Sequence, residues 1–221
     1  MSFNIAIDGP AGAGKSTIAK RAAKELQFVY VDTGAMYRAI ALGILRQGAD
    51  EENEKSLEDA LGKIEVSIGY ENGEQQVYLN GENVSGLIRT EEVSRMASAA
   101  AAKPQVRAKL TQLQRDLAKR ENVLMDGRDI GTAILPQAQL KIYLTASVHT
   151  RAKRRYLEQT QRGEQCSLEE IEKDIEERDY RDMHRETAPL CQAADAVLVD
   201  SSEMTIEEVV EYILKLARER M

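Results

Sequence analysis

The stretch from Asp8 to Thr17 constrains this chain more than any other, because it reads Asp-Gly-Pro-Ala-Gly-Ala-Gly-Lys-Ser-Thr. Every fixed position of the phosphate-binding loop pattern G-x-x-x-x-G-K-[ST] is filled. The apolar run from Phe3 to Ile7 predicts a buried parallel strand before the loop, and residues 17–27 predict a helix after it. An ordinary glycine-rich turn would need neither the lysine, nor the serine, nor this flanking strand and helix. The sequence therefore predicts a strand, a phosphate loop and a helix in that order.

The residues of the loop fit the chemistry of phosphate binding. Glycines at 9, 12 and 14 let the backbone curl so that its N–H groups point at phosphate oxygens, at the positive end of a helix. Lys15 is expected to reach the β- and γ-phosphates of a nucleotide. The hydroxyl of Ser16 is expected to bind Mg²⁺.

Composition narrows the class of protein. A chain of 221 residues is long enough for one substantial α/β domain with insertions, and its formal charge of −7 argues against a nucleic-acid partner. Cys166 and Cys191 form no Cys-x-x-Cys motif and have no neighbouring histidine, so neither a zinc site nor a disulfide framework is indicated. We find no signal-peptide pattern and no apolar run approaching ~18 residues. We therefore expect a soluble cytoplasmic protein with small-molecule partners and no membrane association.

Further short apolar runs, at 28–31, 123–125, 140–144 and 196–199, alternate with helical patterns. This alternation predicts a parallel sheet with helices on both faces. These strands end near Asp32, Asp126, Thr145 and Asp200, and ligands of open α/β sheets bind at the carboxyl ends of the strands. Helix starts are predicted by capping boxes at Ser167 and Thr205 and by Pro104. The last helix should bury one apolar face, formed by Ile206, Val209, Val210, Ile213 and Ala217.

The pattern changes between residues 62 and 86, where two strands at 64–68 and 76–79 are joined by Glu71-Asn72-Gly73, a hairpin signal. An alanine-rich helix is predicted at 90–102. Together they could form a flap over the crevice, or a surface insertion without a role in the chemistry. Residues 159–165 are polar, carry one glycine and lie between two charged helices, which predicts a mobile lid.

Arginines gather in four stretches, at residues 32–38, 126–129, 151–155 and 178–185. Enzymes that catalyse phosphoryl transfer act mostly through positioned cations. Arginines that converge on a phosphate loop would therefore fit such an enzyme. Residues 178–185 could also be a solvated charged helix. A phosphate acceptor is largely ionised at pH 7 and needs no strong base, so surface roles are expected for His149 and His184.

These motifs carry a resemblance over essentially the whole chain. The loop, the run D-T-G-A-M-Y-R at 32–38, D-G-R-D-I-G-T at 126–132 and E-R-D-x-R-D at 177–182 resemble the bacterial type of cytidylate kinase, a nucleoside monophosphate kinase. The resemblance implies an α/β fold with a five-stranded parallel P-loop sheet in the order 2-3-1-4-5, flanked by helices, with an antiparallel insertion and a short lid. It implies a single domain with a core at 1–61, 103–155 and 184–221, an insertion at about 62–102 and a lid at about 156–166.

The resemblance also implies the reaction, transfer of the γ-phosphate of ATP with Mg²⁺ to CMP or dCMP, and we expect the protein to be a monomer. The catalytic cations would be Lys15, Arg128, Arg154 and Arg185. ATP would be bound by Gly9, Pro10, Ala11, Gly12, Ala13, Gly14, Lys15, Ser16 and Thr17, with Ser16 also holding the metal.

The acceptor site follows from the same resemblance. Thr33, Arg38, Arg128 and Arg185 would hold the acceptor nucleotide and its phosphate, with Tyr37 beside them. Ser98, Arg107 and Asp129 would read cytosine, and Arg178 and Asp182 would contact the sugar. Thr33 stands where some members have serine, which retains the hydroxyl. Asp129 could instead only orient Arg128 as an ion pair.

Two other functions remain open on the sequence. One is a kinase of the same fold acting on UMP, AMP or another acceptor. The other is a nucleotide-binding switch that regulates a partner by hydrolysis. Such a switch should carry a guanine-reading Asn-Lys-x-Asp, and no Asn-Lys pair occurs in the chain.

Overall fold

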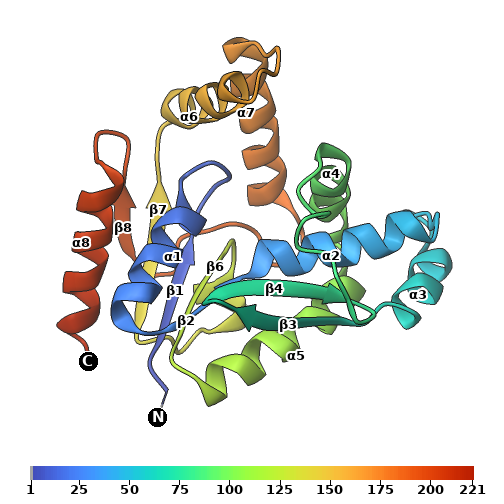
Figure 1. The fold of residues 1–221 in the computed structure, drawn as a ribbon, viewed down its shortest axis with the longest axis horizontal. Helices are drawn as coiled ribbons and strands as arrows, with labels where there is room; N and C mark the ends of the chain where they lie inside the picture. The colour runs from blue at the N-terminus through green and yellow to red at the C-terminus, as the bar shows by residue number, and fades with distance from the viewer. Residues whose placement is uncertain (1) are drawn as a thin grey trace. The chain divides into compact units, whose positions relative to one another are not determined.

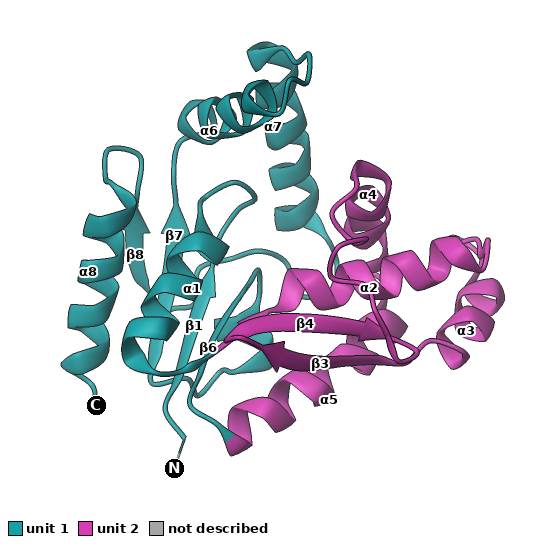
Figure 2. Cartoon of the chain, in the orientation of Figure 1, with its two compact units in different colours: residues 1–29, 121–221 teal, residues 30–120 magenta. Residues whose placement is uncertain are grey.

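The computed structural model describes residues 2–221, which divide into two compact units. Unit 1 comprises residues 1–29 and 121–221, and unit 2 comprises residues 30–120 (Figure 2). The predicted boundaries of core, insertion and lid do not coincide with this division and stay predictions.

The larger sheet of the structure has five strands (Figure 1). Its strands are β1 (Asn4–Asp8), β2 (Val29–Asp32), β6 (Val123–Gly127), β7 (Leu140–Thr145) and β8 (Val197–Asp200). Their order is β2-β6-β1-β7-β8, which is the predicted 2-3-1-4-5 when only these five strands are counted, so the fold class is confirmed. β1 pairs in parallel with β6 and β7, and β7 with β8.

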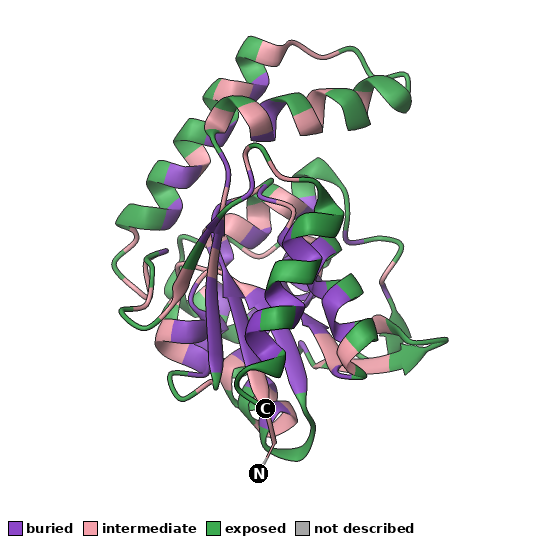
Figure 3. Ribbon diagram, turned by 90° about the vertical axis from the view of Figure 1, so that its left-hand side faces the viewer, coloured by how far each residue is buried: buried purple, intermediate pink, exposed green. Residues whose placement is uncertain are grey.

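Burial explains why these strands read as apolar runs. Ile5, Ala6 and Ile7 of β1 are fully buried, as are the first three residues of β6 (Figure 3). A strand covered on both faces has no solvent side and shows no polar alternation. The parallel register brings the carboxyl ends of β1, β6, β7 and β8 to one edge of the sheet.

The helices of unit 1 are α1 (Lys15–Leu26), α6 (Val148–Gln161), α7 (Leu168–His184) and α8 (Ile206–Arg218), with one π-helical turn, η1 (Ile130–Ile134). Helix α8 begins with the predicted capping box between Thr205 and Glu208. At the start of α7, one of the two bonds of the predicted capping box is described, from Glu170 N–H to the Ser167 hydroxyl. The apolar face of α8 is buried as expected except at Ile206. That residue is 40 % exposed, because it lies in the first turn at the end of the packed face.

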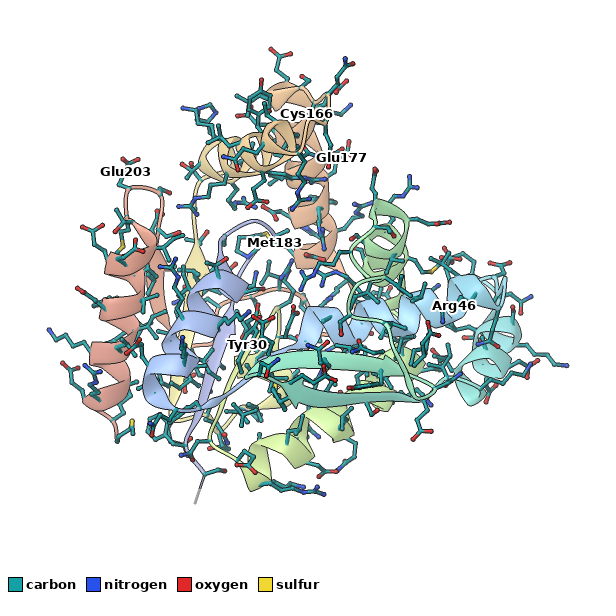
Figure 4. All side chains as sticks on the ribbon, viewed as in Figure 1. Tyr30, Arg46, Cys166, Glu177, Met183 and Glu203 are labelled. Atoms are coloured by element: carbon teal, nitrogen blue, oxygen red, sulfur yellow. The ribbon has the colours of Figure 1, made fainter. Side chains whose placement is uncertain are left out.

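Helices α6 and α7 form a helical hairpin that packs on a small core of its own (Figure 1). Ala152 of α6 and Ile171 and Ile175 of α7 form this core, with Tyr156 and Cys166 against it. Cys166 lies at the turn end of the hairpin (Figure 4). The predicted lid therefore consists of the last turns of α6 and the connection to α7.

Unit 2 contains the helices α2 (Thr33–Arg46), α3 (Glu54–Gly62), α4 (Glu91–Ala100) and α5 (Pro104–Arg120). Its antiparallel sheet, in the order β3-β4-β5, is formed by β3 (Val66–Glu71), β4 (Glu74–Leu79) and β5 (Glu82–Asn83). The predicted hairpin is present, with Asn72 and Gly73 both at positive φ, as a two-residue turn of this kind requires. The first strand begins two residues later than predicted, because Ile64 is buried in the core of the unit ahead of the ladder. The short β5 had no sequence signal.

Among residues 2–221, no helix is both long and apolar enough to cross a membrane.

Candidate active site

The phosphate loop lies between β1 and α1, as predicted. Gly9, Gly12 and Gly14 all adopt positive φ, at 149°, 76° and 84°. Gly14 caps α1 in the left-handed conformation, so the helix begins at Lys15, two residues earlier than the sequence predicted. The first N–H groups of a helix have no partner within the helix, and they make its N-terminus an anion site.

Lys15 is the cation of the loop, and it is 6 % exposed. Its ammonium donates a hydrogen bond to the carbonyl of Pro10 at 2.7 Å. Burial lowers the pKa of Lys15 well below its usual value, and Arg128 and Arg178 lower it further, whereas Asp126 and Asp8 oppose the shift. A bound polyphosphate would favour the charged form of this lysine, which burial disfavours in the free protein.

Ser16 and Asp126 form the part of the site that fits a divalent cation. The Ser16 hydroxyl donates to Oδ2 of Asp126 at 2.9 Å, and Asp126 is buried near the end of β6. A hydroxyl beside a carboxylate is a hard oxygen donor set of the type that Mg²⁺ prefers. The sequence predicted Ser16 as a metal ligand and placed Asp126 only at a strand end, since their contact depends on the pairing of β1 with β6.

Two ion pairs join the segment after β6 to the region around the end of α7. Arg128 Nε donates to Oδ2 of Asp182 at 3.0 Å, and Arg185 Nη2 lies 3.4 Å from Oδ1 of Asp129. All four side chains are at least partly buried. Their place near the end of α7 can be found in Figure 4 from the label of Met183, the residue after Asp182. The described ion-pair partner of Arg128 is Asp182. Arg178, also on α7, is close enough to affect the pKa of Lys15.

The arginines of α6 lie beside the phosphate loop. Arg154 donates to the carbonyl of Ser201 at 2.7 Å, and its Nη1 would lie 4.0 Å from a Cβ placed on Gly14. Arg151 donates to the carbonyl of Ala11 in the loop at 2.9 Å. No role could be assigned to Arg151 from the sequence, because a cluster of basic residues does not show which of them is buried.

The same arginine also joins three elements of unit 1. Arg151 Nη2 donates to Oδ2 of Asp179 on α7 at 2.6 Å, and its Nε donates to the carbonyl of Ala146 after β7 at 2.9 Å. The loop, the end of β7 and α7 are therefore held by one buried guanidinium.

Unit 2 carries the other predicted acceptor residues. Thr33, Tyr37 and Arg38 lie in the first turns of α2, whose N-terminus is capped by Asp32 through a 2.8 Å bond from Ala35 N–H. Arg107 on α5 is buried, and its guanidinium lies 5.9 Å from the ring centre of Tyr37, within cation–π range. Ser98 lies on α4, which packs against α2.

A side-chain amide holds the start of α2 within this unit. Gln75 of β4 accepts a hydrogen bond from Asp32 N–H at 2.8 Å and donates to the Asp32 carbonyl at 3.2 Å. Tyr70 of β3 donates to the carbonyl of Tyr30, which is labelled in Figure 4. The β3–β4 hairpin therefore stabilises the junction between β2 and α2, and Thr33 is the first residue of α2.

The two histidines are exposed, as expected. His149 pairs with Glu172 at 2.5 Å, and the ring of His184 stacks on Tyr180. No cluster of three or more His, Cys, Asp or Glu side chains suited to a metal occurs within residues 2–221.

A phosphate loop on a parallel sheet of this order defines a P-loop nucleotide-binding protein. The solved structures that resemble it agree at the level of the fold. They include an uncharacterised protein from Eubacterium ventriosum, with a TM-score of 0.55, 13 % identity and coverage of 99 % of this chain and 100 % of that one. A shikimate kinase from Bacteroides thetaiotaomicron has a TM-score of 0.50 at 13 % identity, covering 98 % of both chains.

The sequence comparisons are more specific. Residues 5–219 match the family described as cytidylate kinase. A cytidylate kinase of Shouchella clausii is 50 % identical over 217 residues, covering 98 % of this chain and 96 % of the relative. One of Streptococcus pneumoniae is 48 % identical over 221 residues, covering 100 % and 99 %. The chain belongs to the cytidylate kinase family.

Proposed function

We propose that the described residues divide the family reaction between a donor side around the phosphate loop and an acceptor side built on arginines. As a family member, this enzyme phosphorylates CMP and dCMP with ATP. The observation that carries the assignment of roles is the buried Lys15, whose pKa is lowered by burial and by Arg128 and Arg178. Such a charge distribution suits a transferring phosphoryl group, whose oxygens carry the developing negative charge.

On the donor side, residues Gly9–Thr17 bind the phosphates of ATP through backbone N–H groups. Lys15 contacts the β- and γ-phosphates, and Arg154, which lies beside Gly14, provides a second cation. Arg151 holds the loop in place through the carbonyl of Ala11, so it positions rather than contacts the nucleotide.

Ser16 and Asp126 are the side chains that would hold Mg²⁺, Ser16 directly and Asp126 directly or through water. When bound, the metal neutralises charge on the β- and γ-phosphates. Few protein ligands are needed, because Mg²⁺ in such sites keeps waters and binds phosphate oxygens.

On the acceptor side, Arg128 and Arg185 bind the phosphate of CMP, together with Arg38 and Thr33 of unit 2 and with Tyr37 beside them. Arg178 and Asp182 contact the sugar. An oxygen of the CMP phosphate attacks the γ-phosphorus, and the bond to the bridging oxygen of ADP breaks. No general base is required, because the acceptor phosphate has a second pKa of about 6 and is already ionised.

Ser98, Arg107 and Asp129 read the base. Cytosine has an amine where uracil has a carbonyl, and an unprotonated ring nitrogen where uracil has N–H. An ionised aspartate only accepts and an arginine only donates, so Asp129 suits the amine and Arg107 the ring nitrogen. Each mismatch with uracil should cost roughly 1–3 kcal/mol, or about 5- to 150-fold in kcat/KM.

The test compares CMP and UMP as acceptors for the wild type and for Asp129→Ala. Loss of the ion pair with Arg185 affects both substrates equally, whereas loss of base reading weakens CMP and relieves the mismatch with UMP. We expect the ratio of kcat/KM for CMP over UMP to fall by about 5- to 150-fold. Ser98→Ala should do the same more weakly, since a hydroxyl can rotate to donate or accept. An unchanged ratio in Asp129→Ala would refute base reading by this residue.

A coupled assay of ADP release tests the acceptor itself, with CMP, dCMP, UMP, AMP and GMP as substrates. Strong preference for CMP and dCMP is expected. A preference for another monophosphate would favour a different kinase, and hydrolysis without an acceptor would favour a switch. That the enzyme works as a monomer in the cytoplasm, with nucleotides as its partners, is part of the same proposal.

A further inference from the structure

Asp8 is a buried acidic residue that the proposed chemistry does not use. It is the last residue of β1, directly before Gly9 of the phosphate loop, and it is 4 % exposed. Its Oδ1 accepts a hydrogen bond from Ile130 N–H at 2.8 Å, and its Oδ2 accepts one from Gly131 N–H at 2.7 Å. One carboxylate therefore caps the first N–H groups of η1.

The capped turn follows directly on Arg128 and Asp129. Asp129 has φ −147° and ψ 25°, outside the regular helix and strand regions, so this segment is fixed by its contacts rather than by a ladder. Side-chain ion pairs hold it at one end, and Asp8 holds its backbone at the other. Gly131 permits this approach, because a Cβ there would lie 3.3 Å from Oδ2 of Asp8 and 3.1 Å from the Lys141 side chain.

We propose that Asp8 is a positioning residue whose ionised carboxylate fixes the Arg128–Asp129 segment relative to the phosphate loop, so that the acceptor phosphate is aligned with the donor. The geometry supports this because Asp8 is covalently joined to the loop on one side and hydrogen-bonded to the acceptor segment on the other. The inference rests on the acceptor roles proposed for Arg128 and Asp129.

The charge of Asp8 decides whether both hydrogen bonds can form. A carboxylate has two accepting oxygens, whereas a protonated carboxyl must place its own proton on one of them. Burial raises the pKa of Asp8 from 3.8 to about 6, the two backbone bonds and Lys15 lower it, and Asp129 raises it. Tyr143 and Lys141 of β7 are the further titratable groups near this turn. The two-pronged anchor should therefore be complete above about pH 6 and be lost as the pH falls below it.

Ionisation of Asp8 completes the two hydrogen bonds but lowers the stability of the fold. Because the native carboxyl keeps its proton to a higher pH than the unfolded chain, the free energy of unfolding falls as the pH rises from 3.8 to about 6. Ionised Asp8 thus destabilises the fold while it completes the anchor.

The first experiment is a pH titration by NMR of the amide protons of Ile130 and Gly131. In the wild type, both signals should move downfield with a common midpoint of about 6, as the ionised carboxylate forms its two bonds. Asp8→Asn should abolish this titration, and Asp200→Asn, which changes an exposed aspartate at the end of β8, should preserve it. The wild-type titration needs no variant to fold, and amide signals that do not titrate together would overturn the proposal.

The second experiment separates positioning from general support of the loop. In Asp8→Asn, the amide group can accept from one N–H but presents a donor to the other. We expect kcat/KM for CMP to fall by about 10- to 100-fold, the scale of an ångström-size misplacement. KM for ATP should change much less, since Asp8 acts on the ATP side only by favouring the charged form of Lys15. A KM for ATP that rises together with that for CMP, or a kcat/KM equal to that of Asp200→Asn, would contradict the inference. If the wild type did not phosphorylate CMP, the proposed function would fail, while the amide titration would still decide the anchoring.

Discussion

Replacing Arg151 by alanine should destabilise unit 1 strongly, although the residue lies in a run of basic residues that reads as a surface helix. Arg151 is 3 % exposed and donates to the carbonyls of Ala146 and Ala11 and to the carboxylate of Asp179. Alanine removes the cation and leaves Asp179 buried. Oδ1 of Asp179 already has no hydrogen-bond partner among the described residues, so the loss of Arg151 would remove the described side-chain partner of its other oxygen.

The magnitude follows from this geometry. Removing one partner of a buried ion pair costs about 3–5 kcal/mol, because the remaining charge is uncompensated. For a chain of this length, each kcal/mol lowers Tm by about 2–4 °C, so we expect a decrease of about 6–20 °C. Arg151→Met combined with Asp179→Leu should recover much of this loss, since it removes both charges and keeps apolar volume.

The assay measures Tm by differential scanning calorimetry, with Lys153→Ala as the matched control. Lys153 lies two residues further along α6 and is exposed, so its loss should change stability by less than about 0.5 kcal/mol. If Arg151→Ala melted within the range of Lys153→Ala, the buried pair would contribute nothing measurable and the reasoning would be refuted.

Two further predictions concern the phosphate loop. Lys15→Met should lower turnover by on the order of 10²-fold or more in the coupled assay. Its Tm should stay the same or rise, because burial and Arg128 disfavour the charged lysine in the free enzyme. Near-normal turnover would contradict the role of Lys15. Gly9→Ala should disrupt folding or lower Tm markedly, because its Cβ would lie 1.9 Å from the Leu144 carbonyl oxygen at φ 149°. Gly62→Ala, with nothing within 4 Å, is the control and should be neutral or stabilising, and equal melting of the two variants would count against this steric reading.

Local sequence signals determined much of this fold. The phosphate loop needs positive φ at its glycines, and the Asn72-Gly73 turn needs positive φ at both residues, so residue identity alone fixes these conformations. Continuous apolar runs marked the buried parallel strands, because a strand covered on both faces has no polar side. The order of those strands came from the resemblance to a family and not from any local pattern.

Tertiary structure decided which polar groups meet. Asp8 and Ile130 are 122 residues apart, and Arg151 and Asp179 are 28 apart, so their contacts depend on how β1, β6 and the α6–α7 hairpin pack. The sequence offered Asp129 as a partner for the adjacent Arg128, but in the folded chain Arg128 pairs with Asp182. This pairing depends on the packing of α7 beside the segment after β6, which no local sequence pattern shows. The sequence by itself therefore determined the phosphate loop and the elements around it, and only the fold decided which charges are buried, paired and able to position the site.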